Sequence, residues 1–214
     1  RHGEIFEKIR RRYQQAPADE IRSLLQDISR SSVYYRFILF PEQDEGGNLI
    51  RKEIQKSLAR IKNIGHSSPA PFLLILLAAN DRQTNPDAPL SDEELLEIIN
   101  CIESYLIRRM VCLRSDSIYE EVFEILCRGA TDGNGYLTAE ETRSFIASLQ
   151  SPFDIPDDDE FTDHLRYSDL YREDSDNELA FVILKDWKST SPASQGALIP
   201  HLHMHCLRMN LKPG

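Results

Sequence analysis

The stretch DGNGYLTAEE, residues 132–141, has the residue types of a calcium-binding loop. An EF-hand loop supplies oxygen ligands from positions 1, 3, 5, 7, 9 and 12 and has glycine at position 6. With Gly135 placed at position 6, the backbone carbonyl of Tyr136 falls on position 7. The other ligand positions from 3 onward then carry Asp132, Asn134, Thr138 and Glu141. A calcium-binding helical protein with a single loop of this type is therefore one interpretation of the sequence.

Two features of the same stretch oppose calcium binding. The first loop position is Ala130, which has no side-chain oxygen, and no second loop of this type occurs to pair with it. A simple turn explains the same residues, because Gly129 is suited to end one helix and the Asp-Gly-Asn-Gly run is suited to turn the chain. Thr138 would then cap the next helix, with Glu141 as its capping-box partner. We expect a capped turn and no calcium site.

No other group of residues forms a catalytic or metal-binding pattern. His201, His203 and His205 alternate, which would bring metal ligands together on a strand, but their surroundings lack strand patterning. The sequence has no G-x-S-x-G, no H-E-x-x-H and no glycine-rich phosphate loop. Its cysteines, Cys101, Cys112, Cys127 and Cys206, lack C-x-x-C spacing and indicate buried thiols in a reducing, cytoplasmic compartment. We expect no catalytic residue, no cofactor and no metal ligand.

Helical periodicity of apolar residues dominates the chain, and no strand pattern competes with it. Residues 69–80 are apolar all round and predict a buried central helix. Ser91 is placed to be an N-cap, with Glu94 completing a capping box. The predicted helices cover residues 5–13, 21–38, 50–61, 69–80, 92–111, 117–128, 139–149 and 177–188. We expect one irregular all-α domain of roughly seven to nine helices within residues 1–190.

The net charge of −10 is unevenly distributed along the chain. Residues 1–64 have a net charge of +4 and the remainder has −14. An acidic body argues against a main role in gripping nucleic acid, because contacts to phosphates need clustered cations. The basic run at residues 8–13 is interpreted as a solvated helix face. The longest apolar run, residues 72–79, is too short to span a bilayer, so no membrane association is expected.

Five pieces of sequence, in this order, resemble the helical segment of GmrSD-type restriction endonucleases, which are modification-dependent DNA-cleaving proteins. The pieces are APFLLILL, LSDEELLEIINCIESYLIRRMVCLRS, YEEVFEIL, DDDEFTDHLRYSDLYR and ELAFVILKDWKS. Together they cover much of the region from residue 17 to about residue 190. The most specific piece is ESYLIRRMVC, in which an apolar helix ends in the paired arginines Arg108 and Arg109.

The resemblance implies a helical connector without a catalytic site of its own. In that family a ParB-like N-terminal domain handles nucleotide and an HNH-type C-terminal domain cuts DNA, and this chain shows neither. DNA would be reached only through those flanking domains, and a partner domain or subunit is expected. Arg108 and Arg109 would contact the DNA backbone or the neighbouring domain; alternatively, they suit the dipole at the end of a helix. A plain helical interaction scaffold is the remaining alternative.

The residues after position 190 are expected to form a disordered or out-of-frame tail. In the resembling family, the corresponding segment leads to a Thr-x-x-His-x-x-Pro-Gln motif that opens the nuclease domain. If codons are read from the last base of the Pro200 codon, permissible synonymous choices give TFAHALPQNE, which fits that motif. We therefore expect a frameshift near Pro200; a genuine metal-binding tail at His201, His203 and His205 is the alternative.

Overall fold

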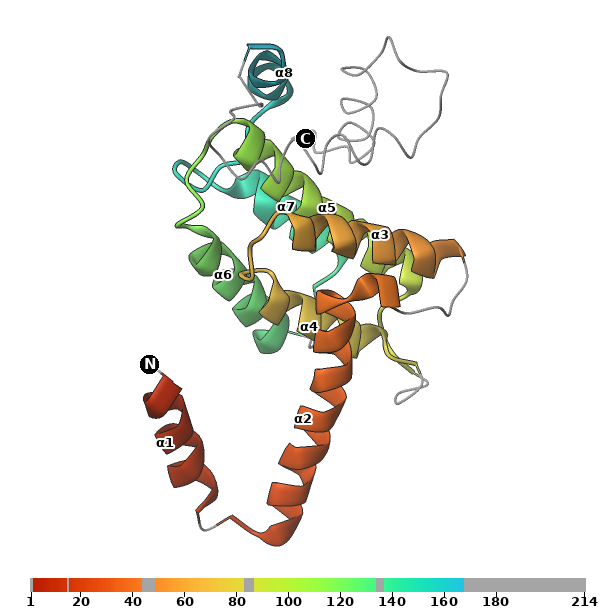
Figure 1. Cartoon of the computed structure of the whole chain (residues 1–214), viewed down its shortest axis with the longest axis vertical. Coiled ribbons are helices and arrows are strands. Elements are labelled where there is room, and N and C mark those ends of the chain that lie inside the picture. Colours follow the sequence, from red (N-terminus) through yellow and green to blue (C-terminus); the bar gives the residue numbers. More distant parts are fainter. Residues whose placement is uncertain (1, 15, 44–48, 83–86, 134–136, 168–214) are drawn as a thin grey trace.

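The computed structural model describes residues 2–14, 16–43, 49–82, 87–133 and 137–167. All regular structure in these ranges is helical, with eight α-helices and one short 3-10 helix (Figure 1). The helices are α1 (His2–Tyr13), α2 (Ala18–Leu39), η1 (Pro41–Gln43), α3 (Leu49–Asn63), α4 (Ala70–Asn80), α5 (Asp92–Val111), α6 (Tyr119–Asp132), α7 (Ala139–Ser148) and α8 (Asp158–Tyr167). This confirms the all-α prediction.

The first seven predicted helices correspond to α1–α7. Helix α8 is not among the helices predicted from the sequence, and its first turn contains Asp158, Asp159 and Glu160. Acidic side chains stabilise a helix N-terminus, which explains why this charged run can start a helix. The predicted helix at 177–188 and the tail at 191–214 lie outside the described residues.

Helix α5 is the centre of the fold and packs against α3, α4, α7 and α8. Its predicted N-cap is confirmed, since Ser91 Oγ accepts a hydrogen bond of 3.1 Å from the backbone N–H of Glu94, whereas the return bond from the Glu94 side chain that a capping box requires stays a prediction. Most of its side chains are buried, including Leu95, Ile98, Ile99, Ile102, Tyr105, Leu106 and Val111. Helix α4 packs against α2, α5 and α6, so the apolar run predicted as a central helix does lie in the core.

A buried ion pair fixes α3 against α5. The guanidinium of Arg60 binds the carboxylate of Glu103, whose residue is fully buried, and it also donates a hydrogen bond of 2.9 Å to Ser57 Oγ. The hydroxyl of Ser57 in turn donates to Asn100 Oδ1 over 2.9 Å. Removing either charged partner would leave the other buried and uncompensated, so this contact favours one orientation of the two helices.

Helices α1 and α2 form an arm that projects from the helical body (Figure 1). We call residues 2–33 of these helices the arm. Ile38, near the end of α2, is the only residue of this 22-residue helix that is buried. Within the arm, Leu25, Ile28 and Val33 have 60%, 55% and 64% of their surface exposed. The arm therefore displays apolar side chains that the rest of the described chain does not cover.

The C-terminus of α5 is closed by a residue in the left-handed region. Leu113 has φ of 53° and its N–H donates to the carbonyl of Met110 over 3.1 Å. The N–H of Arg114 reaches back to the carbonyl of Arg109 over 2.8 Å. This pair of bonds is the Schellman arrangement, in which glycine normally occupies the left-handed position. Here a leucine, 74% exposed, occupies it.

Replacing Leu113 with glycine is expected to stabilise the chain. Glycine removes the cost of a left-handed leucine, about 1–2 kcal/mol, and adds unfolded-state entropy that offsets part of it. The free energy of unfolding in urea should rise by about 0.5–1 kcal/mol. Leu113→Ala is the control, because it removes the same exposed side chain and retains the strained φ. A glycine variant no more stable than the alanine variant would contradict this assignment of strain.

Candidate functional site

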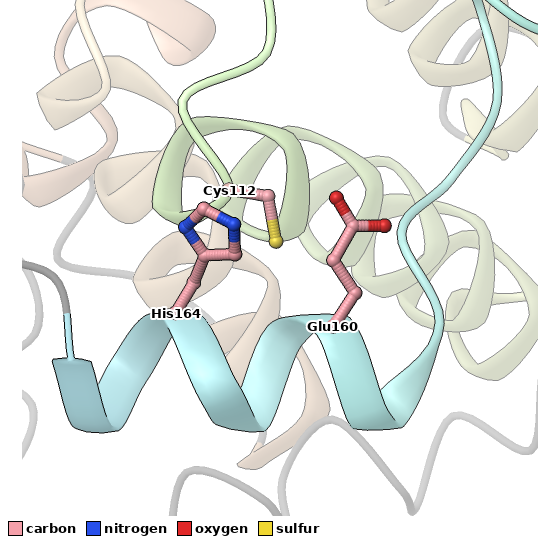
Figure 2. A group of neighbouring side chains, drawn as sticks. All are labelled: Cys112, Glu160 and His164. Atoms are coloured by element: carbon pink, nitrogen blue, oxygen red, sulfur yellow. The ribbon is translucent and has the colours of Figure 1, made fainter.

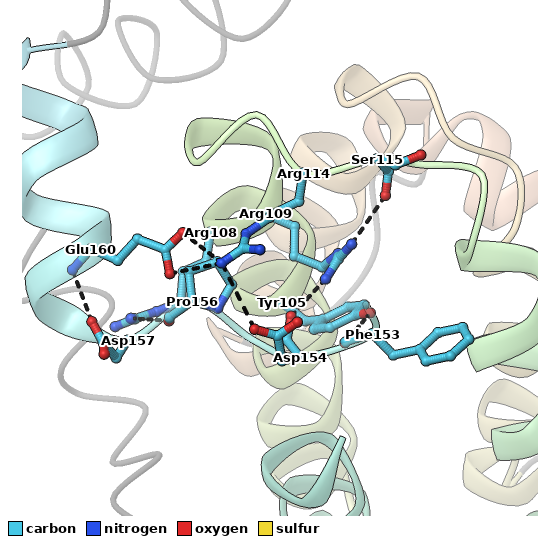
Figure 3. A network of polar contacts seen from close by, with 10 residues as sticks. All are labelled: Tyr105, Arg108, Arg109, Arg114, Ser115, Phe153, Asp154, Pro156, Asp157 and Glu160. Carbon is cyan, nitrogen blue, oxygen red and sulfur yellow. Dashed lines mark hydrogen bonds and ion pairs between the residues drawn. The ribbon is translucent and has the colours of Figure 1, made fainter. Parts of the chain in front are cut away.

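The paired arginines that the sequence singled out lie inside the protein. Arg108 and Arg109, in the last turn of α5, are 4% and 1% exposed. Both guanidinium groups bind the segment 153–158, which leads into α8 (Figure 3). In the part of the chain that the structure describes, the contacts of these two groups are internal. Contact with DNA or with a neighbouring domain stays a prediction.

Arg109 joins three parts of the chain. Its Nη1 donates to the carbonyl of Asp154 over 2.6 Å, and its Nη2 donates to the carbonyl of Ser115 over 3.1 Å. Its guanidinium carbon lies 5.6 Å from the ring centre of Tyr105 and 5.9 Å from that of Tyr119. Aromatic faces attract cations, and the interaction strengthens when water is excluded. The positive charge is thus held by two carbonyl oxygens and two rings.

Arg108 and Arg114 hold the start of α8. Arg108 donates to the carbonyl of Pro156 over 2.9 Å and pairs with the carboxylate of Asp158, and it also lies over the ring of Phe161 at 5.1 Å. Arg114 donates from Nη2 to the two carboxylate oxygens of Glu160 over 2.8 and 3.0 Å. Arginine side chains in and just after α5 thus bind the stretch that follows α7, in addition to the packing of its Phe153 and Ile155 against the core (Figure 3).

Cys112, Glu160 and His164 meet beside this network. Their ligand atoms, one sulfur, one carboxylate oxygen and one imidazole nitrogen, all lie within 4.8 Å of one another. Cys112 is the residue directly after α5, whereas Glu160 and His164 lie one turn apart on α8. Figure 2 shows the sulfur of Cys112 directed toward α8, between the ring of His164 and the carboxylate of Glu160. We call these three residues the Cys-Glu-His cluster.

The electrostatics of the cluster keep its thiol protonated. Burial raises the pKa of Cys112 to about 11, and the negative charge of Glu160 acts in the same direction. The positive charges of Arg114 and Arg108 lower that pKa, and Asp157 raises it again. Since a protonated thiol is a poor nucleophile, the cluster does not have the features of an activated catalytic cysteine.

The amino-acid sequence alone does not identify this cluster. Cys112 and the two α8 residues are far apart in the sequence, and only the packing of α8 on the end of α5 brings them together. Glu160 and His164 by themselves form an i, i+4 pair, a spacing that places two side chains on one helix face and also occurs in many helices without a site. The i, i+4 spacing of Glu160 and His164 is therefore too common to identify a metal site from the sequence.

The candidate calcium loop is a capped helix start. Helix α6 continues to Asp132, so Ala130, the first loop position, lies within a helix and is buried. At the other end, Thr138 Oγ1 accepts a hydrogen bond of 3.2 Å from the N–H of Glu141, and Glu141 Oε2 accepts one of 2.8 Å from the N–H of Thr138. This confirms the predicted capping box. Hydrogen bonds from Thr138 lower the pKa of Glu141.

Gly129 does not end its helix, contrary to the sequence interpretation. Helix α6 passes through Gly129 and has Gly133 as its C-cap residue. The apolar stripe of α6 explains the difference, because Leu126 and Ala130 are both buried and packing continues across Gly129. Tertiary packing of this kind outweighs the helix propensity cost of a glycine, which is about 1 kcal/mol.

Comparisons with protein-family models, curated proteins and solved structures give no significant match to the chain. Among the described residues, every helix is either too short or too polar to cross a bilayer. The histidines at 201, 203 and 205 lie outside the described residues.

Replacing Arg109 with lysine is expected to lower the free energy of unfolding in urea by about 2–4 kcal/mol, because one ammonium group cannot reach two buried carbonyls and stack on two rings. Arg128→Lys is the matched control. Arg128 is also helical, but it is exposed and pairs with Glu124 within its own helix, so the same change should cost less than about 0.5 kcal/mol. Equal effects for the two variants would show that Arg109 is not a structural anchor.

Calorimetric titration with calcium is expected to show no binding in the sensor range, about 10 µM or tighter, because the first loop position is a buried alanine in a helix. Glu141→Gln should weaken the cap by about 1 kcal/mol and leave the calcium response unchanged. A dissociation constant of about 10 µM or tighter that is lost in this variant would establish a calcium site.

Proposed function

We propose that this chain is the helical connector of a GmrSD-type modification-dependent DNA restriction protein, and that its arm binds a neighbouring domain or subunit. Nucleotide handling and DNA cleavage belong, in this proposal, to flanking ParB-like and HNH-type domains. The sequence resemblance supports the family, and the exposed apolar stripe of the arm is the observation that carries the connector role.

The stripe has the spacing of a helix that packs against a partner. Ile21, Leu24, Leu25 and Ile28 follow the i, i+3, i+4, i+7 pattern, which places them on one face of α2. Ile21 is 37% exposed and Leu24 is half-buried, so none of the four is fully covered within this chain. Complete burial of an aliphatic side chain stabilises a contact by about 1.5–3 kcal/mol before the costs of association.

The arm also differs in charge from the body. Lys8, Arg10, Arg11 and Arg12 are all exposed on α1, whereas residues beyond 64 have a net charge of −14. Most helical stability in proteins comes from the packing of an apolar face, so a projecting pair of helices gains stability from a partner that covers that face.

A helical interaction scaffold outside DNA restriction is the second candidate function. The exposed stripe supports it equally, because an apolar helix face identifies a contact and not the partner. The DNA on both sides of the coding segment distinguishes the two functions. The single-loop calcium-binding alternative receives no such support, since Glu141 Oε2 is bound to the backbone N–H of Thr138 in the capping box.

The DNA on both sides of the coding segment tests the family. We expect a ParB-like domain to be encoded in frame before Arg1. We also expect an HNH-type domain after the segment, in the frame that starts on the last base of the Pro200 codon. DNA that encodes neither domain would contradict the connector role in a restriction protein and leave the scaffold function.

Charged substitutions in the stripe test the arm. Leu25→Asp with Ile28→Asp should reduce phage restriction by the protein that includes both flanking domains by at least about tenfold, because a charge cannot be buried in an apolar contact without a large cost. Ser23→Asp with Gln26→Asp is the matched control, since it adds the same charges to the opposite, exposed face of α2. Both pairs should leave the unfolding of the isolated chain nearly unchanged. Equal restriction by the two variants would rule out the stripe as the contact.

A further inference from the structure

We propose that the Cys-Glu-His cluster binds a zinc ion between the end of α5 and α8. The inference rests on the geometry of Cys112, Glu160 and His164 and does not depend on the proposed connector function. It concerns a site in the body of the protein, at the end opposite the arm (Figures 1 and 2).

The spacing of the three ligand atoms is close to what a zinc ion requires. Zinc bound at about 2.0–2.3 Å in a tetrahedron holds its ligands about 3.4–3.7 Å apart. The three atoms here lie within 4.8 Å of one another, so contractions of at most about 1.4 Å suffice. Glu160 and His164 make such a shift by side-chain rotation, because both are only half-buried and rise from one face of α8.

The ligand types select zinc over the hard cations. A thiolate and an imidazole are soft or borderline ligands, which suit zinc and cobalt, whereas magnesium and calcium prefer shells made of oxygen. As the zinc–sulfur bond forms, the thiol proton of Cys112 leaves to solvent. Three protein ligands leave the fourth tetrahedral position to a water molecule.

Arg114 orients the carboxylate ligand. It donates to both oxygens of Glu160 from one side, over 2.8 and 3.0 Å. If one oxygen turns to the metal, the other remains within reach of the guanidinium, as in zinc sites where an outer residue holds the ligating carboxylate. The positive charge of Arg114 also repels the zinc ion, so binding requires both negative ligands, the thiolate of Cys112 and the carboxylate of Glu160.

A bound ion would fasten α8 to the body. Helix α8 has ten residues, too few for a stable isolated helix. Phe161 is buried against the body and Asp158 pairs with Arg108 in the first half of α8, whereas in the second half Leu165 packs against the core and is only partly buried. A metal bridge from Cys112 to His164 would attach the next turn, because His164 lies beyond Phe161 along the helix.

Metal titration of the whole chain tests the site. Each protein would be titrated in two forms, one with His201, His203 and His205 intact and one with all three replaced by alanine, which separates the cluster from the histidine run of the tail. After treatment with a chelator, we expect one equivalent of zinc by calorimetry, and with cobalt the charge-transfer absorption of a thiolate ligand. Cys112→Ser and His164→Ala should each weaken zinc binding by at least about 100-fold. Cys127→Ser is the control, since Cys127 is a half-buried thiol outside the cluster.

The outcomes are distinct. Circular dichroism of the metal-free variants establishes whether they remain folded. If Cys112→Ser is unfolded, zinc binding by His164→Ala tests the site instead. Zinc binding that is lost in a folded cluster variant and kept in Cys127→Ser supports the site. Absence of binding, cobalt spectra without thiolate absorption, or binding unaffected by both cluster substitutions overturns it. Binding seen only when the tail histidines are present assigns the metal to the tail and also overturns it.

Discussion

The burial of a positive charge at the end of α5 is the constraint on which the arrangement of the last described helices depends. A guanidinium removed from water must find hydrogen-bond acceptors, or the fold pays several kcal/mol. Arg109 finds them in the carbonyls of Asp154 and Ser115, which belong to segments on either side of α6 and α7. The charge therefore helps to determine the path of both connections, together with apolar side chains such as Phe153 and Ile155, which pack against the core.

Neighbouring contacts extend the same principle. Arg108 binds the carbonyl of Pro156 and the carboxylate of Asp158, and Tyr105 donates from its hydroxyl to the carbonyl of Phe153 over 3.0 Å. Burial raises the pKa of Tyr105, so this hydroxyl stays a donor at ordinary pH. Side chains from one face of α5 thus satisfy successive backbone groups of the 153–158 segment. Such a segment needs these partners because an unpaired buried carbonyl is costly.

The sequence predicted the helices well and the long-range polar contacts poorly. Periodicity located α1–α7 because each carries its apolar stripe locally, and the Thr138–Glu141 cap is also a local signal. Except for Ser115, the hydrogen-bond partners of Arg108 and Arg109 lie beyond two further helices. Nothing in the spacing of an arginine pair indicates whether it faces solvent or a loop. Gly129 was misjudged for a related reason, because packing of α6 outweighed a local preference. The Cys-Glu-His cluster exists only once α8 is placed.

A rigid body and an exposed arm have different physical requirements, and this chain separates them. The body is held by the core around α5, the Arg60–Glu103 pair and the arginine network. The arm has an apolar stripe with no cover in the described residues, which suits a surface that becomes ordered against a partner.

Amide hydrogen exchange compares the arm and the body most directly. It would be measured on the chain alone and on the chain joined to the domains encoded on either side. The amides of residues 21–33 should gain protection only in the joined protein, while those at the end of α5 stay equally protected in both. Unchanged exchange in the arm, together with new protection around Arg108 and Arg109, would contradict the arm as the contact surface.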